Sequence, residues 1–156
     1  MPRWVPKESL LAMAGREFGP SSWLEIDQDR IDRFADATLD RQFIHVDPDK
    51  AARTPFGGTI AHGFLSLSLL PFLSEEHAVA PEGTAMAINY GLNKVRFLQP
   101  VRAGSRVRLH SKIIAVDEKT GGRILVRGEA TLELEGHAKP ALVAETLSMY
   151  FVEKKG

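Results

Sequence analysis

The chain has 156 residues, and its 20 basic and 20 acidic side chains give a formal net charge of zero. This length predicts one domain over residues 1–156, and the neutral balance argues against a nucleic-acid partner, because nucleic-acid-binding domains are usually basic. The absence of cysteine excludes disulfides, a thiolate nucleophile and cysteine ligands for zinc. No apolar stretch reaches the roughly 20 residues that span a membrane, and no signal peptide is recognisable, so we expect no membrane partner and a cytoplasmic location.

The first part of the chain is expected to be mainly helical. Residues 9–14 predict a short helix that Gly15 ends, and residues 22–26 predict a short strand. Asp27 is suited to cap the next helix, because its carboxylate can accept a backbone N–H. The helix itself follows from apolar spacing along one face, at Ile31, Phe34, Ala35 and Thr38.

The helical period is lost over residues 40–47, which indicates a loop. Asp47 and Pro48 then mark the start of a short helix, since Asp is a favoured cap and Pro a favoured first position. Residues 60–77 predict a long, mostly apolar helix, which Pro71 should bend or divide. A helix that is apolar on most sides is expected to be buried.

The second half of the chain is typical of β-structure. Turn signals rich in glycine and proline separate four strand-like segments, at residues 84–98, 105–116, 123–134 and 141–152. Helices followed by antiparallel strands predict an α+β fold, with the sheet packed on the long helix.

A first candidate site is the pair Asp40 and His45, five residues apart in the expected loop. If the loop folds back, a carboxylate and an imidazole can share a proton between acid and base forms. The alternative is purely structural, with Asp40 capping a turn and His45 bonded to the backbone.

A second candidate site is the glycine-rich segment 57–63, which leads into the long helix. Glycine lets a ligand approach the backbone closely, and unpaired N–H groups at a helix start suit the oxyanion of a thioester. The alternative is that these glycines only permit a tight turn and close packing. We expect His62, within this segment, to be mainly structural.

A third candidate is a basic stretch, because residues 83–116 contain no Asp or Glu and six Lys or Arg. Period two places Arg106 and Arg108 on one strand face. They could meet the phosphates of a carrier such as coenzyme A, but a solvated sheet face is the favoured interpretation. No set of residues indicates a metal ligand sphere, so we expect no metal and no cofactor.

The residues from Phe34 to Pro48, FADATLDRQFIHVDP, resemble the signature of the MaoC-like dehydratases, the (R)-specific enoyl-CoA hydratases. The segment PFGGTIAHG at residues 55–63 fits the same family. The segment NYGLNKVRF at residues 89–97 and the triplet KPA at 139–141 are similar to the branch of nodulation protein N.

The resemblance implies a hot-dog fold, in which an antiparallel sheet wraps around a long central helix. It also implies reversible addition of water to a trans-2-enoyl thioester, an acyl-CoA substrate, a link to fatty-acid metabolism, and a homodimer. The catalytic pair of the family falls on Asp40 and His45. Residues implied to contact substrate are Gln42, Gly63, Ser68, Asn89 and Arg96.

One departure from the family pattern lies between the two catalytic positions. The wider family has Asp-x-Asn-Pro-x-His, whereas Gln42 and Phe43 stand here in place of Asn and Pro. Two alternatives to a hydratase stay open. One is a thioesterase on the same fold, and the other is a non-catalytic protein that binds an acyl-CoA or a lipid signal.

Overall fold

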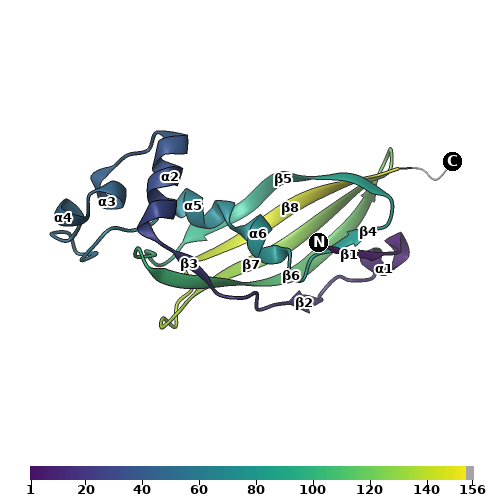
Figure 1. Cartoon of the computed structure of the whole chain (residues 1–156). Coiled ribbons are helices and arrows are strands. Elements are labelled where there is room, and N and C mark those ends of the chain that lie inside the picture. Colours follow the sequence, from purple (N-terminus) through teal and green to yellow (C-terminus); the bar gives the residue numbers. More distant parts are fainter. Residues whose placement is uncertain (154–156) are drawn as a thin grey trace.

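A computed structural model describes residues 1–153 of the chain. Its main element is a six-stranded sheet with four long antiparallel strands that lie side by side in the order β6-β7-β8-β5 (Figure 1). Their bounds are β5 (Thr84–Phe97), β6 (Ser105–Lys119), β7 (Arg123–Leu134) and β8 (Leu142–Val152). These strands confirm the four segments predicted from the turn signals.

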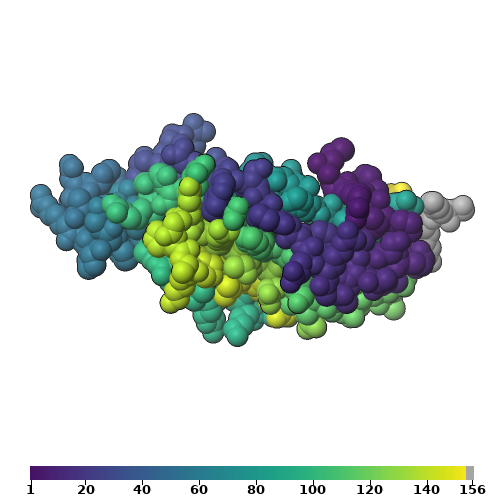
Figure 2. All heavy atoms as spheres, turned by 90° about the horizontal axis from the view of Figure 1, so that it is seen from below, coloured from purple at the N-terminus to yellow at the C-terminus, as the bar shows by residue number. Residues whose placement is uncertain are grey.

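Four short strands complete the β-structure. β2 (Glu17–Phe18) and β3 (Leu24–Ile26) both pair with β6, and β3 confirms the strand expected near residues 22–26. β1 (Arg3–Val5) and β4 (Val79–Pro81) pair with each other in parallel, which the sequence did not indicate. The N-terminal segment therefore wraps along one end of the molecule (Figure 2, purple).

Six short helices precede β5. They are α1 (Lys7–Leu11), α2 (Gln28–Thr38), α3 (Phe43–Val46), α4 (Pro48–Ala51), α5 (Gly63–Ser68) and α6 (Leu70–Ser74). Asp27 caps α2 as predicted, since its carboxylate accepts the Arg30 N–H at 2.8 Å. Asp47 likewise caps α4 through the Lys50 N–H at 3.0 Å.

Two helical predictions are corrected. The segment expected to be a loop contains α3, because four residues form a single turn that shows no apolar period. The expected long helix over residues 60–77 is two short helices, α5 and α6, which meet at Leu69. Pro71 lies in the first turn of α6, where its missing N–H costs no hydrogen bond, so the predicted division at this proline is confirmed.

The core lies between α5–α6 and one face of the sheet (Figure 1). Leu65 and Leu73 pack there with Val107 and Leu132, which are fully buried. Val107 and Leu109 point inward while Arg106 and Arg108 point outward, as strand alternation predicts. Helices α2, α3 and α4 lie beyond the end of the sheet and hold the candidate active site against the start of α5 (Figure 1).

The strand β5 forms one edge of the sheet, since β8 is its one partner among residues 1–153. Large apolar side chains on it are exposed: Met86, Ile88, Tyr90, Leu92 and Phe97. No helix in the part of the chain described is long and apolar enough to cross a membrane.

Candidate active site

Asp40 lies two residues after the end of α2, directly after a turn in the backbone. Leu39, the residue before it, has φ of 65° in the left-handed region, which is uncommon for a residue other than glycine. The chain thereby turns sharply and leaves the Asp40 side chain exposed. The Gln42 N–H donates to this carboxylate at 3.4 Å, so the structural alternative, in which Asp40 caps a turn, is also present.

His45 lies on α3 and is buried, with 7% of its surface exposed. Its Nδ1 is 2.7 Å from the Ile60 carbonyl oxygen. Because a carbonyl only accepts, Nδ1 carries the proton and Nε2 of the neutral ring keeps its lone pair. Burial lowers the pKa of His45 below its ordinary 6.5. The Ile60 hydrogen bond opposes this shift in part, His62 adds a smaller lowering, and the Asp40 carboxylate adds a still smaller increase.

Gln28, at the start of α2, fixes the backbone around His45. Its amide nitrogen donates to the His45 carbonyl at 2.7 Å, and its amide oxygen accepts a hydrogen bond from Thr59. One side chain therefore joins α2, α3 and the segment before α5, so His45 is positioned through its main chain as well as through its ring.

His62 links the two candidate catalytic residues. Its ring stacks on that of His45, with centroids 3.8 Å apart, and Phe34 packs against it at 4.9 Å. Its Nε2 donates to the backbone carbonyl of Asp40 at 2.9 Å. His62 is 3% exposed, which fits a structural role, but its Nδ1 is buried with no hydrogen-bond partner among residues 1–153.

A carboxylate oxygen of Asp40 and one ring nitrogen each from His45 and His62 lie within 4.8 Å of one another. Two hydrogen bonds of about 2.8 Å meeting at one water span a distance of this order. Binding of one metal ion by both imidazoles does not fit, because nitrogen lone pairs lie in the ring planes and the two planes are stacked at 24°. The geometry thus suits a shared water better than a metal.

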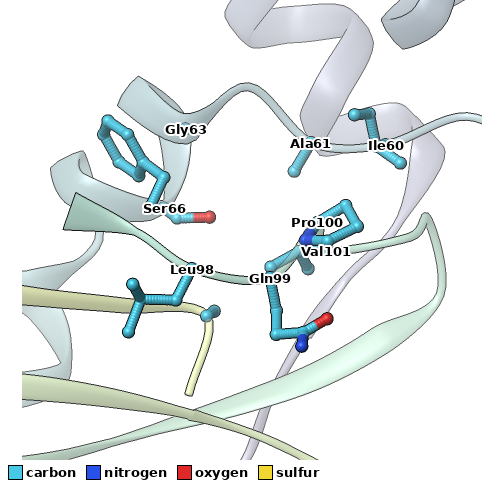
Figure 3. A pocket seen from close by; sticks show the side chains of 10 residues that line it. Ile60, Ala61, Gly63, Ser66, Leu98, Gln99, Pro100 and Val101 are labelled. Carbon is cyan, nitrogen blue, oxygen red and sulfur yellow. The ribbon is translucent and has the colours of Figure 1, made fainter. Parts of the chain in front are cut away.

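A pocket of about 190 Å³ lies beside this cluster (Figure 3). Its lining combines the start of α5, the end of β5 and the loop that follows, with Gly63, Ser66, Phe97 and Gln99 among its residues. Gly63 directly follows His62, so it connects the histidine cluster with the pocket. A Cβ on Gly63 would lie 3.0 Å from the Phe97 ring, so close packing favours glycine here.

The other residues implied to contact substrate are dispersed. Gln42 is exposed next to Asp40, at the N-cap of α3. The Ser68 hydroxyl is bonded to the Phe64 carbonyl of its own helix at 2.7 Å, on an exposed part of α5. Arg96 adjoins the pocket residue Phe97, whereas Asn89 lies eight residues earlier on β5, roughly 26 Å away along an extended strand.

Two arginines of the basic stretch are paired with acidic residues of β7 and of the position directly after it. Arg106 binds Glu135 with two contacts of 2.5 Å, and Arg108 binds Glu133 at 2.6 and 3.0 Å. His110 shares Glu133 at 2.6 Å. This arrangement supports the solvated sheet face rather than a phosphate site. The period-two acidic residues Glu129, Glu133 and Glu135 were the sequence signal for it.

Comparison with known proteins identifies the family of this chain. The family model of the MaoC like domain matches residues 10–136. The chain belongs to the MaoC-like dehydratase family. It is 50% identical over 141 residues to 3-hydroxyacyl-thioester dehydratase Z of Mycobacterium tuberculosis (strain ATCC 25618 / H37Rv), covering 90% of this chain and 93% of that relative.

Two further comparisons support the branch and the fold. Nodulation protein N of Rhizobium leguminosarum bv. viciae is 45% identical over 136 residues, covering 86% of this chain and 84% of that protein. The structure of the monoamine oxidase regulatory protein from Archaeoglobus fulgius superposes with a TM-score of 0.80 at 22% identity, covering 99% of both chains. The α+β hot-dog fold implied by the motifs is confirmed.

The contacts of two residues at this candidate site were not indicated by the sequence. The contacts of His62 depend on stacking with a residue 17 positions away, which no local pattern shows. Ser66, and not Ser68, lines the pocket. These serines are two positions apart, so they point about 200° apart around a helix, and composition alone does not decide which one faces inward.

Proposed function

We propose that this protein is an (R)-specific enoyl-CoA hydratase, or 3-hydroxyacyl-CoA dehydratase, that uses Asp40 and His45 as its catalytic pair. The observation that carries this proposal is the close approach of the Asp40 carboxylate to a neutral His45 whose Nε2 is free to accept a proton. The relative from Mycobacterium tuberculosis, named as a 3-hydroxyacyl-thioester dehydratase, supports the same reaction class.

In the hydration direction, one water binds between Asp40 and His45. Nε2 of His45 accepts one proton of this water as the oxygen attacks C3 of the enoyl thioester. The Asp40 carboxylate accepts a hydrogen bond from the other O–H and orients the water. The C2=C3 electron pair moves toward the thioester carbonyl, and the His45 imidazolium then returns the proton to C2, which restores the neutral ring.

The developing enolate requires a hydrogen-bond donor at the thioester oxygen. The backbone N–H of Gly63 has this role in the proposal, because Gly63 adjoins both His62 and the pocket. A donor placed for the enolate binds the transition state more strongly than the ground state, which is what accelerates the reaction. The chemistry requires neither a redox cofactor nor a metal.

His62 acts as a positioning residue in this mechanism. Its hydrogen bond holds the Asp40 main chain, and its ring supports the plane of His45. Its Nε2 carries the proton that binds the Asp40 carbonyl.

A homodimer formed through β5 completes the proposal. The edge of β5 offers unpaired backbone groups over 14 residues, and its exposed apolar side chains suit contact with a second copy. Pairing of two such edges would continue the sheet from one protomer into the next. Sedimentation at micromolar concentration tests this: a fully active species of 17.2 kDa would contradict it.

The reaction itself is tested with crotonyl-CoA. The enoyl-thioester absorbance should fall on mixing with the protein, and the product should be the (R)-3-hydroxy thioester. Release of free CoA would instead identify a thioesterase, and binding without any change of absorbance would identify a non-catalytic binding protein. Asp40→Asn should bind the substrate and lower the rate of this absorbance loss by about 10²-fold or more.

A further inference from the structure

The pocket beside Gly63 contains a polar group that the protein leaves unused. Its walls are mostly apolar, from Ile60, Ala61, Leu98, Pro100, Val101 and Ala141. Ser66 is 3% exposed, and its hydroxyl is directed into the pocket (Figure 3). Within residues 1–153 this hydroxyl makes no hydrogen bond, whereas the Ser68 hydroxyl on the same helix is bonded to the Phe64 carbonyl.

A hydroxyl that opens onto a mostly apolar pocket and has no protein partner normally binds water or a ligand. The other polar side chain in the lining, Gln99, also makes no side-chain hydrogen bond within the part of the chain that the structure describes. The pocket therefore combines apolar walls with one hydroxyl and one carboxamide. This composition suits a ligand in which methylene groups alternate with amides.

The proposed reaction determines which part of the substrate reaches this pocket. C3 of the acyl group must approach the water between Asp40 and His45, on the side of the segment 60–63 that carries the His62 ring. The sulfur side of the thioester then extends from Gly63 toward the pocket. In thioesters of coenzyme A and of acyl carrier proteins, the sulfur is followed by two methylenes and an amide.

We propose that the pocket binds the first amide of the carrier arm, with the Ser66 hydroxyl as its hydrogen-bond partner and the apolar walls packed on the methylenes. The inference rests on the proposed function, because the thioester must lie at Gly63. It assigns substrate recognition to Ser66 instead of Ser68. An acyl chain in the pocket is the competing occupant, but its hydrocarbon would leave the Ser66 hydroxyl unpaired.

Ser66→Ala is the test variant, and Ser68→Ala is its matched control on the same helix. Binding is measured by calorimetry with saturated thioesters, which cannot be hydrated. Ser66→Ala should weaken binding of butyryl-CoA and butyryl-pantetheine by about three- to tenfold, the effect of one hydrogen bond. Binding of S-ethyl thiobutyrate, which has no amide, should not change, and Ser68→Ala should bind all three as the wild type does.

Butyryl-acyl carrier protein is the fourth ligand, and its affinity relative to butyryl-CoA shows which carrier supplies the arm. Equal weakening of the amide-containing thioesters and the amide-free one by Ser66→Ala would overturn the proposal and place the acyl chain in the pocket. Unchanged binding in Ser66→Ala, with an active wild type, would also overturn it. A wild type that neither binds nor hydrates any thioester would refute the proposed function and this inference together. That result differs from the two outcomes for Ser66→Ala, in which the wild type is active.

Discussion

The polar side chains on the outer face of the sheet differ from those around residues 40–66 in the partners that they have. On the outer face, Arg106, Arg108 and His110 each have an acidic partner on β7 or directly after it, and Trp23 packs under Arg108 at 4.3 Å. Around residues 40–66, the Nδ1 of His62 is buried without a hydrogen-bond partner in the described part of the chain, and Ser66, which is 3% exposed, lines the pocket.

This difference distinguishes a surface that stabilises the fold from a region suited to binding a ligand. Paired charges on a strand face satisfy each other and leave little capacity for a ligand. Unpaired polar groups at a buried site lower stability, so their presence is expected where a substrate or a water supplies the missing partner. The charge count alone pointed to the outer face. Within residues 1–153, buried groups without a hydrogen bond occur in both regions, at His62 Nδ1 and at Arg127 Nε, but Arg127 Nε lies 3.6 Å from a Glu145 oxygen and so has an ionic partner.

The largest loss of activity is expected when the proposed catalytic pair is changed. Asp40→Asn and His45→Gln should each lower kcat by about 10²-fold or more, because each removes a positioned proton acceptor or orienting group. The two losses should not add fully, since both residues act on one water. Steady-state hydration of crotonyl-CoA measures the effect.

Asp29→Asn is the control for the first of these variants. Asp29 is an exposed carboxylate on α2 that pairs with Arg33, so its loss should leave kcat unchanged. Near-wild-type turnover in Asp40→Asn or His45→Gln, with thermal unfolding showing an intact fold, would remove the proposed mechanism.

His62→Gln should have the next largest effect, lowering kcat by about 10- to 100-fold through displacement of Asp40 and His45. It should also raise the pKa of His45, because His62 contributes to lowering it. The acidic limb of the kcat/KM profile should therefore move to higher pH. A loss of stability with an unmoved pH profile would restore the purely structural interpretation of His62; His77→Gln, at an exposed histidine, is the control.

Gly63→Ala tests the packing beside the pocket. The new Cβ would lie 3.0 Å from the Phe97 ring, so the free energy of unfolding should fall by about 1–3 kcal/mol, the usual effect of overpacking. Adding Phe97→Leu should recover most of this loss in urea denaturation. Unchanged stability in Gly63→Ala would show that Phe97 moves freely, and the requirement for glycine would then concern the ligand alone.

The buried His45 should make the free energy of unfolding depend on pH. Burial holds the pKa of His45 below 6.5, so the unfolded chain binds more protons than the folded one as pH falls past that value. The free energy of unfolding should therefore decrease as pH drops below about 6.5 and be insensitive to His45 above it. Urea denaturation between pH 8 and 5 should show a weaker decrease in His45→Gln; an identical decrease would mean that the ring titrates normally.

The smallest effect is expected on the outer face. Arg106→Ala and Arg108→Ala remove exposed or half-exposed ion pairs, which contribute about 0–1 kcal/mol. KM for crotonyl-CoA should stay within about twofold of the wild type, because these arginines are already bound to glutamates. A rise in KM that grows at low salt would instead show that they attract the carrier phosphates.

The parts of the structure that sequence reasoning predicted depend on local patterns. The strands β5 to β8 were predicted because strand alternation and turn glycines repeat along the chain. The start of α2 was predicted because Asp27 is a favoured capping residue. The Asp40–His45 pair was proposed from a contiguous motif, and the structure places a carboxylate oxygen and a ring nitrogen of the two residues within 4.8 Å of each other. The parts that were missed depend on contacts between distant segments.

The parallel pairing of β1 with β4 joins residues more than 70 positions apart, and each strand has three residues, so neither shows a period of its own. The left-handed conformation of Leu39 has no glycine to signal it. The roles of His62 and Ser66 follow from which side of a short segment each one faces. That orientation is set by the packing of α5 against the sheet and not by the residues themselves.

The open edge of β5 has a consequence for how the protein folds in the cell. Until a partner covers it, the edge presents 14 residues of strand with four large apolar side chains on its first nine residues, and its charged residues are confined to Lys94 and Arg96 near the far end. Such an edge is a template for any other unpaired strand. If two copies pair through β5 as proposed, the interval between folding and this pairing is the period of greatest aggregation risk. The yield of refolded protein should be highest at an intermediate protein concentration. At low concentration a folded chain rarely encounters a second copy, and at high concentration incompletely folded chains aggregate with one another.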